Sequence, residues 1–286
     1  MKILVLGASG QLGQCIKKIA VEKNKQNDLI FPEEHTADIL DKTMLKSLFE
    51  ETNPSYVINC AAYTAVDKAE DDIELCRKVN AIGALNIALL CKDFGAAMIH
   101  ISTDFVFRGD LPDLLKENDP AAPINIYGLT KLEGEREIQA NLPEHFIFRT
   151  SWLYSEYGNN FVKTMLRLGG ERSELNVIAD QIGTPTYAMD LAKLLLMVAQ
   201  QNKKEYGLYH YSNEGVASWY DFASGVFELG NMAVKVRPIP TSQYPARAIR
   251  PKFSVMDKTK VKEIFGIEVP HWRQSLQECI DKLNDL

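Results

Sequence analysis

The sequence predicts an α/β protein with a doubly wound parallel sheet and a second, smaller mixed α/β lobe. Up to about residue 150, short apolar runs alternate with segments whose apolar residues recur at helical spacing. A glycine-rich turn directly follows the first run. After Arg149 the alternation loosens. We therefore expect a first domain of residues 1–150 and a second lobe of residues 151–286, some segments of which return to the first domain.

The apolar runs of the first domain are expected to be strands. They are Lys2–Leu6, Leu29–Phe31, Tyr56–Cys60, Met98–Ser102 and His145–Arg149. Between them, Met44–Phe49 and Ala81–Phe94 supply helix faces. Strands that alternate with helices favour parallel pairing with right-handed crossovers, which gives a doubly wound sheet.

The second lobe is expected to be less regular. Helices are predicted at Asn160–Leu168, Ala188–Gln200, Trp219–Leu229 and Pro270–Leu283, and a strand at Leu208–Ser212. A proline-punctuated stretch, Pro238–Pro251, carries cations that include Arg250. This stretch is either a solvated connection or a loop that closes over a ligand.

The composition describes an ordinary globular protein. Of its 286 residues, 46% are hydrophobic and 24% charged, which excludes fibrous and disordered classes. The formal charge of −6, without basic runs, gives no footprint for nucleic acid. The 5 cysteines lack a CxxC spacing, which argues against a disulfide framework or a zinc site and favours a cytoplasmic location. We expect neither a signal peptide nor a membrane segment.

The glycine turn predicts a dinucleotide site of the Rossmann type. Gly7, Gly10 and Gly13 follow the first strand and open a helix, so the backbone can approach a diphosphate at the helix N-terminus. Glu33, near the end of the second strand, is placed to accept a hydrogen bond from a ribose 2′-hydroxyl, which favours NAD over NADP. The alternative is that Glu33 and Glu34 form a solvated loop.

Tyr127 and Lys131 are the predicted catalytic pair. Four residues apart on one helix, they share a face, and the ammonium is expected to lower the pKa of the phenol. The spacing alone is weak evidence, but the pair follows the fourth strand and so approaches the edge that carries the glycine turn. Thr103, at the end of that strand, is expected to hydrogen-bond the same carbonyl oxygen as Tyr127; capping the strand end is the alternative.

Several longer runs carry a resemblance to a known family. They are GASGQLG, NCAAYTAVDKAE, NAIGALNIA, ISTDFVF, INIYGLTKLEGE, FRTSWLY, GNNFVKTMLRL, DQIGTPTYAMDLA and GLYHYSNEGVASWYDFA. Together they resemble the extended short-chain dehydrogenases/reductases and, more narrowly, the dTDP-4-dehydrorhamnose reductases, over nearly the whole chain. The resemblance implies reduction of the C4 ketone of a dTDP-sugar by NADPH or NADH, in the last step of dTDP-rhamnose formation.

The resemblance also implies roles for individual residues. Tyr127 donates the proton, Lys131 holds the nicotinamide ribose and Thr103 completes the triad. Trp152, Thr103 and Asp104 contact the sugar nucleotide, and we expect Arg250 to meet its diphosphate. The expected cofactor residues, besides Tyr127 and Lys131, are Gly7, Gly10, Gln11, Leu12, Gly13, Glu33, Asp38, Ile39, Ala61, Ala62, Tyr63, Thr64 and Asn80.

The sequence departs from the family at two positions. Some relatives dimerise around a magnesium ion held by glutamates, where this chain has Cys15 and Met189. Neither side chain is a hard-oxygen ligand, so we expect no bound metal, and either a monomer or a dimer without a metal bridge.

Four other functions are weighed against the reductase. A dehydratase is disfavoured because Phe105 stands where such enzymes place a glutamate. An epimerase, a reductase making dTDP-6-deoxy-L-talose and a non-catalytic partner like the regulatory subunit of methionine adenosyltransferase share most of these motifs. These three alternatives stay open at this point.

Overall fold

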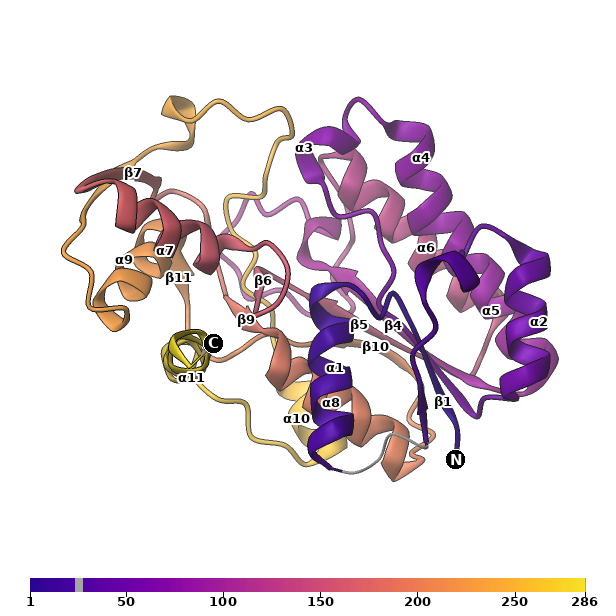
Figure 1. Cartoon of the computed structure of the whole chain (residues 1–286). Coiled ribbons are helices and arrows are strands. Elements are labelled where there is room, and N and C mark those ends of the chain that lie inside the picture. Colours follow the sequence, from indigo (N-terminus) through magenta and orange to yellow (C-terminus); the bar gives the residue numbers. More distant parts are fainter. Residues whose placement is uncertain (24–27, 286) are drawn as a thin grey trace.

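A computed structural model describes residues 1–23 and 28–285 as a six-stranded sheet between two layers of helices, with a second lobe beside it (Figure 1). The sheet strands are β1 (Ile3–Leu6), β2 (Leu29–Ile30), β3 (Tyr56–Asn59), β4 (Ala97–Thr103), β5 (His145–Thr150) and β10 (Gly207–His210). Their order is β2-β1-β3-β4-β5-β10, with every neighbouring pair parallel. The order reverses at β1, where doubly wound sheets form their ligand crevice.

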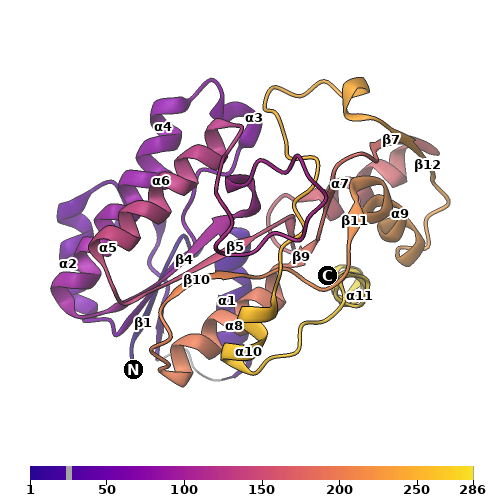
Figure 2. The same cartoon turned by 180° about the vertical axis from the view of Figure 1, so that it is seen from behind.

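Alternate residues of β1 supply the two faces of the sheet. Ile3 and Val5 belong to one apolar core, and Leu4 and Leu6 belong to the other. The first core is covered by α1 (Gln11–Glu22), α8 (Ala188–Gln201) and α10 (Thr259–Phe265). The second is covered by α2 (Lys42–Thr52), α5 (Gly83–Phe94) and α6 (Ile126–Asn141), as Figure 2 shows from behind. Both faces are buried, which explains why the strands read as continuous apolar runs.

The chain leaves the sheet at its carboxyl edge through short elements. After β3 come α3 (Val66–Ala69), α4 (Ile73–Arg77) and a π-helical turn, Lys78–Ile82, that leads into α5. Three 3₁₀ turns lie at Glu34–Thr36, Asp104–Val106 and Thr241–Gln243. Residues of the Glu34–Thr36 turn, of α4 and of the π-helical turn line a groove at this edge.

The second lobe is built from very short strands and two helices. β6 (Leu153–Tyr154) pairs with β9 (Thr186–Tyr187), β8 (Ile182–Gly183) with β11 (Ala217–Ser218), and β7 (Glu174–Ile178) with β12 (Lys235–Ile239). The helices are α7 (Phe161–Glu171) and α9 (Trp219–Leu229). The start of the proline-punctuated stretch therefore lies in a strand, β12. The predicted strand Leu208–Ser212 overlaps β10, which returns to the main sheet.

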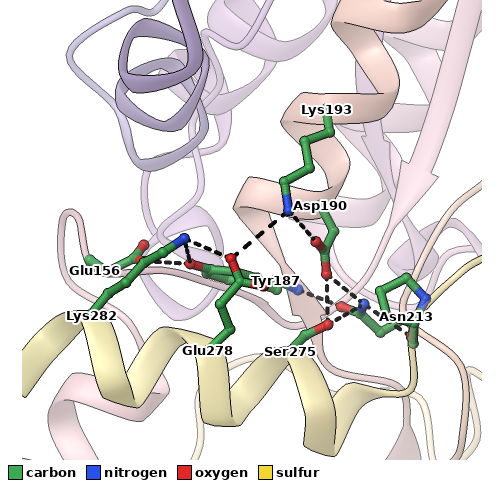
Figure 3. Close-up of polar contacts among 9 residues, drawn as sticks. Glu156, Tyr187, Asp190, Lys193, Asn213, Ser275, Glu278 and Lys282 are labelled. Carbon is green, nitrogen blue, oxygen red and sulfur yellow. Dashed lines mark hydrogen bonds and ion pairs between the residues drawn. The ribbon is translucent and has the colours of Figure 1, made fainter. Parts of the chain in front are cut away.

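The last helix, α11 (Trp272–Asn284), is fastened by three buried polar side chains that we call the α11 clamp: Asp190, Asn213 and Ser275 (Figure 3). Ser275 donates to Asp190 at 2.6 Å, and Asn213 donates to Asp190 at 3.0 Å. Asn213 Oδ1 accepts the backbone N–H of Tyr187 at 2.7 Å. The clamp thus joins α11 to the start of α8 and to the segment after β10.

Further along α11, a second group of side chains continues this junction. Lys282 donates to the Tyr187 hydroxyl at 3.2 Å, and Tyr187 donates to the buried Glu156 (Figure 3).

Within the described ranges, no helix is long and apolar enough to cross a membrane.

Candidate active site

The glycine turn forms a cradle of bare backbone at the end of β1. Gly7 has a φ of +72°, and a Cβ on it would lie 2.5 Å from the backbone nitrogen of Ala61. A Cβ on Gly13 would lie 2.6 Å from the Gly7 carbonyl oxygen. Both positions therefore require glycine, and they bring the N-terminus of α1 to the crevice. The chemistry of this cradle fits a dinucleotide diphosphate.

A groove of about 920 Å³ continues from the cradle along the carboxyl edge of the sheet. Its lining includes eight of the predicted cofactor residues: Gly7, Gly10, Glu33, Asp38, Ile39, Ala61, Ala62 and Tyr63. The Glu33 side chain lies at the rim, 80% exposed, with its carboxylate 3.2 Å from His35. The groove is large enough for a ligand of dinucleotide size.

The other predicted cofactor residues surround the groove in different ways. Leu12 and Gly13 are buried in α1, and Thr64 is exposed. Asn80 is buried and accepts the backbone N–H of Tyr63 at 2.9 Å, which fixes the groove wall. Gln11 donates to the Leu153 carbonyl at 3.2 Å and so ties the cradle to the second lobe.

Tyr127 lies on the first turn of α6, which Asn125 caps by accepting the Gly128 N–H at 2.8 Å. A Cβ on Gly128 would lie 2.1 Å from the Phe105 carbonyl oxygen, so glycine allows α6 to meet the end of β4 closely. The Phe105 ring packs edge-on against Tyr127, with centroids 5.7 Å apart. The half-buried phenol is thereby held beside Thr103.

The expectation that an ammonium lowers the pKa of Tyr127 is wrong for the ligand-free site. Burial raises the pKa of Tyr127, and the Asp104 carboxylate raises it further, while the Thr103 hydroxyl acts in the opposite direction. The phenol is therefore protonated at neutral pH. A protonated phenol is the form that can donate a proton.

Lys131 lies one turn further along α6 and is almost completely buried, with 1% exposed. Its Nζ lies 2.5 Å from the Ile101 carbonyl oxygen and 3.2 Å from His100 Nε2. Burial lowers the pKa of Lys131 to about 8, although the Glu135 carboxylate favours the charged form. Lys131 therefore lies between β4 and α6 with both protonation states within reach near neutral pH.

Thr103 and Asp104 close β4 at the same edge. The Thr103 hydroxyl donates to Asp104 Oδ1 at 3.1 Å and accepts the Phe105 N–H at 3.2 Å. Asp104 is 2% exposed, and its Oδ2 has no hydrogen-bond partner in the described part of the chain. Burial raises the pKa of Asp104 to about 6. An orphaned carboxylate oxygen of this kind is suited to a ligand hydroxyl.

Trp152 and Arg250 come from the second half of the chain. Trp152 adopts a left-handed φ of +47°, and its ring stacks on Trp219 with centroids 3.6 Å apart and planes 8° apart. Arg250 pairs with Asp67 of α3 at 2.6 Å, which fastens the proline-punctuated stretch to the first domain. The hydrogen bond from Arg250, helped by the backbone N–H groups of Ala248 and Arg247, lowers the pKa of Asp67 to about 2, although partial burial acts in the opposite direction.

Four residues of this site were missed by the sequence analysis: Asn59, Asp67, His100 and Trp219. His100 and Asn59 lie within apolar strands and resemble core positions. Trp219 opens a helix, where an aromatic residue gives no separate signal. Asp67 lies in the run NCAAYTAVDKAE, which carried the resemblance but no role for this carboxylate.

A glycine cradle at a sheet reversal and a Tyr–Lys pair beside a strand-end threonine define a short-chain dehydrogenase/reductase of the extended class. Comparison with known proteins narrows this class. The model of the RmlD substrate binding domain family matches residues 1–285. The dTDP-4-dehydrorhamnose reductase of Aggregatibacter actinomycetemcomitans is 40% identical, over 96% of this chain and 97% of that protein.

Solved structures agree with this result. A dTDP-4-dehydrorhamnose reductase from Clostridium acetobutylicum is 44% identical, with a TM-score of 0.94 over 99% of this chain and 100% of that one. The reductase from Bacillus anthracis in complex with NADP is 40% identical, with a TM-score of 0.93 over the same shares of the two chains. The chain belongs to the RmlD family of dTDP-4-dehydrorhamnose reductases.

The UDP-glucose 4-epimerase of Thermotoga maritima, 20% identical with a TM-score of 0.82 over 100% of this chain and 99% of that one, shares the fold alone.

Proposed function

We propose that the protein reduces the C4 ketone of dTDP-4-dehydro-β-L-rhamnose to dTDP-β-L-rhamnose with NADPH or NADH, the last step of dTDP-rhamnose biosynthesis. The observation that carries the proposal is the cluster of Tyr127, Lys131 and Thr103 around the carboxyl end of β4, at the edge of the sheet where the glycine cradle also lies. Full-length similarity to dTDP-4-dehydrorhamnose reductases supports the substrate, and a relative in complex with NADP supports the cofactor.

When bound, the nicotinamide cofactor supplies a hydride to the C4 carbon of the ketone. Tyr127 donates its phenolic proton to the carbonyl oxygen, so hydride and proton together convert the ketone to the alcohol. Thr103 hydrogen-bonds the same oxygen as negative charge develops on it. Lys131 holds the nicotinamide ribose and stabilises the phenolate that Tyr127 leaves behind.

The remaining roles follow the chemistry of each side chain. The flat ring of Trp152 packs on the deoxysugar, and Asp104 accepts a hydrogen bond from a sugar hydroxyl. Arg250 contacts the diphosphate of the sugar nucleotide. The cofactor residues named from the sequence hold the dinucleotide, with Glu33 at the adenosine ribose.

Residues 1–150 then form the dinucleotide-binding domain, and residues 151–286 mainly form the substrate-binding lobe. Segments of the second half that pack with the first domain include β10, α8 and α10. We propose that the enzyme is cytoplasmic and has no nucleic-acid partner. It is a monomer or a dimer without a metal bridge, because Cys15 and Met189 are buried in the core between α1 and α8. An increase in molecular mass on adding magnesium would contradict this.

The deciding experiment mixes the purified protein with dTDP-4-dehydro-L-rhamnose and NADPH or NADH. Loss of nicotinamide absorbance with a rhamno product, identified by NMR, is the expected result, and the two rates give the cofactor preference. If the product is dTDP-6-deoxy-L-talose, the mechanism is the same but the hydride reaches the opposite face of the C4 ketone. No oxidation, by protein that still binds the cofactor, contradicts the proposal and favours a non-catalytic partner of the methionine adenosyltransferase type.

A further inference from the structure

His100 lies directly beneath Lys131 and has no role in the reduction as described so far. It lies on β4, is 1% exposed, and its Nε2 is 3.2 Å from Lys131 Nζ. Its Nδ1 is 3.1 Å from Asn59 Nδ2, at the end of β3. Both ring nitrogens therefore have a nitrogen neighbour, so the positions of the hydrogens decide what each contact is.

The hydrogen positions follow from the backbone. The Ala61 N–H donates to Asn59 Oδ1 at 3.0 Å, and a backbone N–H can only donate. This contact fixes the orientation of the Asn59 amide and turns its Nδ2 towards His100. An amide nitrogen also only donates, so Nδ1 of His100 is the acceptor. In a neutral imidazole the proton is then on Nε2.

The Nε2–H group points at Lys131 Nζ. An ammonium group has three donors and no acceptor, whereas an uncharged amine has a lone pair that can accept this hydrogen bond. The amine still has hydrogens for the Ile101 carbonyl at 2.5 Å. A charged imidazolium is not an alternative, because burial, the largest cause, holds the pKa of His100 well below its usual range.

We propose that His100 is a positioning residue for Lys131: held in the Nε2–H tautomer by Asn59, its ring donates to the uncharged amine and favours that form in the ligand-free site. The consequence for catalysis rests on the proposed function. The uncharged fraction of Lys131 does not stabilise phenolate, which adds to the burial that keeps Tyr127 a phenol, the acid form that reduction requires.

The other charged and titratable groups around Lys131 act against His100. Glu135 on α6, Cys76 on α4 and Cys60 after β3 all favour the ammonium form. The Glu135 carboxylate is already engaged by Arg149, at 2.6 Å, which limits its influence. His100 itself is faced by Lys131 and by His145 of β5. The hydrogen bond donated by His100 therefore favours the uncharged amine of Lys131, whereas the neighbouring charges favour the ammonium.

Protonation of Lys131 would also disturb the groove. To face an ammonium, His100 must accept at Nε2 and carry its proton on Nδ1, which the Asn59 amide can meet only by turning over. The Ala61 N–H would then lose its acceptor. This N–H lies against Gly7, so the charge of Lys131 is coupled to the backbone of the cradle.

The first test is the tautomer of His100 above pH 8, where a pKa of about 8 leaves Lys131 mostly uncharged. Histidine labelled with ¹⁵N reports which ring nitrogen carries a proton, and the spectrum of His100→Gln assigns the signal. We expect a protonated Nε2 and a bare Nδ1. A protonated Nδ1, or an imidazolium, overturns the proposal. The measurement needs no turnover, so its failure is distinct from failure of the proposed function.

The second test reverses the tautomer. Asn59→Asp offers one oxygen to the Ala61 N–H and another to His100 Nδ1–H, which leaves Nε2 free to accept from a lysine ammonium. We expect the pKa of Lys131, followed by ¹³C-labelled lysine and assigned with Lys131→Met, to rise by about one unit or more. The rise should be smaller in a His100→Gln background. Equal rises in both backgrounds would show a simple charge effect and overturn the proposal.

A kinetic readout separates this role from a purely structural one. In Asn59→Asp the pH midpoint of kcat should move in the same direction as the pKa of Lys131. His145→Gln, which removes another buried histidine but no hydrogen-bond partner of Lys131, should leave the midpoint in place. A midpoint that stays fixed while the pKa moves contradicts the catalytic consequence.

Discussion

The α11 clamp and the cluster around Lys131 are two buried polar groups within one chain. In the clamp, Asn213 uses its oxygen for Tyr187 and its nitrogen for Asp190 and Ser275. The second cluster consists of Lys131, Tyr127, Thr103 and Asp104, and its hydrogen bonds are incomplete. Asp104 Oδ2 has no hydrogen-bond partner among the described residues.

This difference separates polar groups that hold the fold from polar groups kept for a ligand. A saturated cluster stabilises the folded state because each buried group has its partner. An unsaturated cluster, or one that buries a titratable lysine, costs stability, and active sites commonly bear such a cost. Substitutions in the α11 clamp should therefore lower stability and leave activity unchanged. Substitutions in the cluster around Lys131 should lower activity without lowering stability.

The largest effect is expected at Tyr127. Tyr127→Phe removes the proton donor while keeping the ring against Phe105, so kcat should fall roughly 10²–10⁴-fold. Cofactor binding, measured by fluorescence titration, and the denaturant midpoint should stay close to those of the wild type. Tyr244→Phe, at a tyrosine that is 53% exposed, is the control. Turnover within a few-fold of the wild type would remove Tyr127 from the mechanism.

The next effect belongs to the clamp. Asn213→Ala leaves the Tyr187 N–H without its acceptor and removes one of the hydrogen bonds to Asp190, which should lower the free energy of unfolding by about 1–3 kcal/mol. The kcat of the folded fraction should be unchanged, since no hydrogen bond in the described part of the chain joins a clamp residue to Tyr127, Lys131 or Thr103. Chemical denaturation measures the loss, and Asn176→Ala, exposed on β7, is the control. A loss no larger than that of the control would mean that the clamp does not stabilise the fold.

A smaller effect of opposite sign is expected at Lys131. Its pKa is lowered to about 8, from 10.5. Below pH 8 the folded state therefore carries the full cost of a buried ammonium, and between pH 8 and 10.5 this cost is relieved as the pH rises. Lys131→Met should be more stable than the wild type at neutral pH by on the order of 1 kcal/mol, after its lost hydrogen bonds are deducted, although turnover is lost.

The pH dependence is the sharper part of this prediction. The advantage of Lys131→Met should shrink by roughly 1 kcal/mol per pH unit above pH 8. Denaturation at several pH values measures it, with Lys17→Met on the exposed side of α1 as the control. A difference between variant and wild type that is constant with pH would show that Lys131 carries no such cost.

The two clusters also differ in how far the sequence predicts them. Motifs whose residues lie close together in the sequence could be predicted. They are the glycine turn of Gly7, Gly10 and Gly13 and the Tyr127–Lys131 pair on one helix. His100 and Asn59 were missed because their bond joins positions 41 residues apart, and neither strand signals it. The clamp escaped for the same reason, since Asn213 and Ser275 are 62 residues apart.

The fold shows the same division between local and distant information. In the first domain, β1, β3, β4 and β5 could be predicted because a run buried on both faces is visible in the sequence. The two-residue β2 was found only as part of the apolar run Leu29–Phe31. β6, β8, β9 and β11 have two residues each, and two residues have no periodicity. Parallel pairing of β7 with β12 depends on the packing of the lobe, which no local pattern specifies.

The smallest effect on stability is expected at Arg250, between the two lobes. Its ion pair with the half-exposed Asp67 is worth less than about 1 kcal/mol, so Arg250→Ala should barely change unfolding. If Arg250 leaves Asp67 to meet the diphosphate, the same variant should raise KM for the sugar nucleotide roughly 5- to 10-fold with little change in kcat.

Asp67→Asn distinguishes an arginine that binds the ligand from an arginine that only joins the two lobes. The variant replaces the competing carboxylate by an uncharged amide and leaves Arg250 in place, so it should lower KM or leave it unchanged. A KM that rises equally in Arg250→Ala and Asp67→Asn would show that the ion pair only joins the lobes. Because the pair then acts by holding the lobes together, it would belong with the α11 clamp among the contacts that maintain the fold. Opposite responses would place Arg250 with Lys131 and Asp104, whose partners are completed by the ligand.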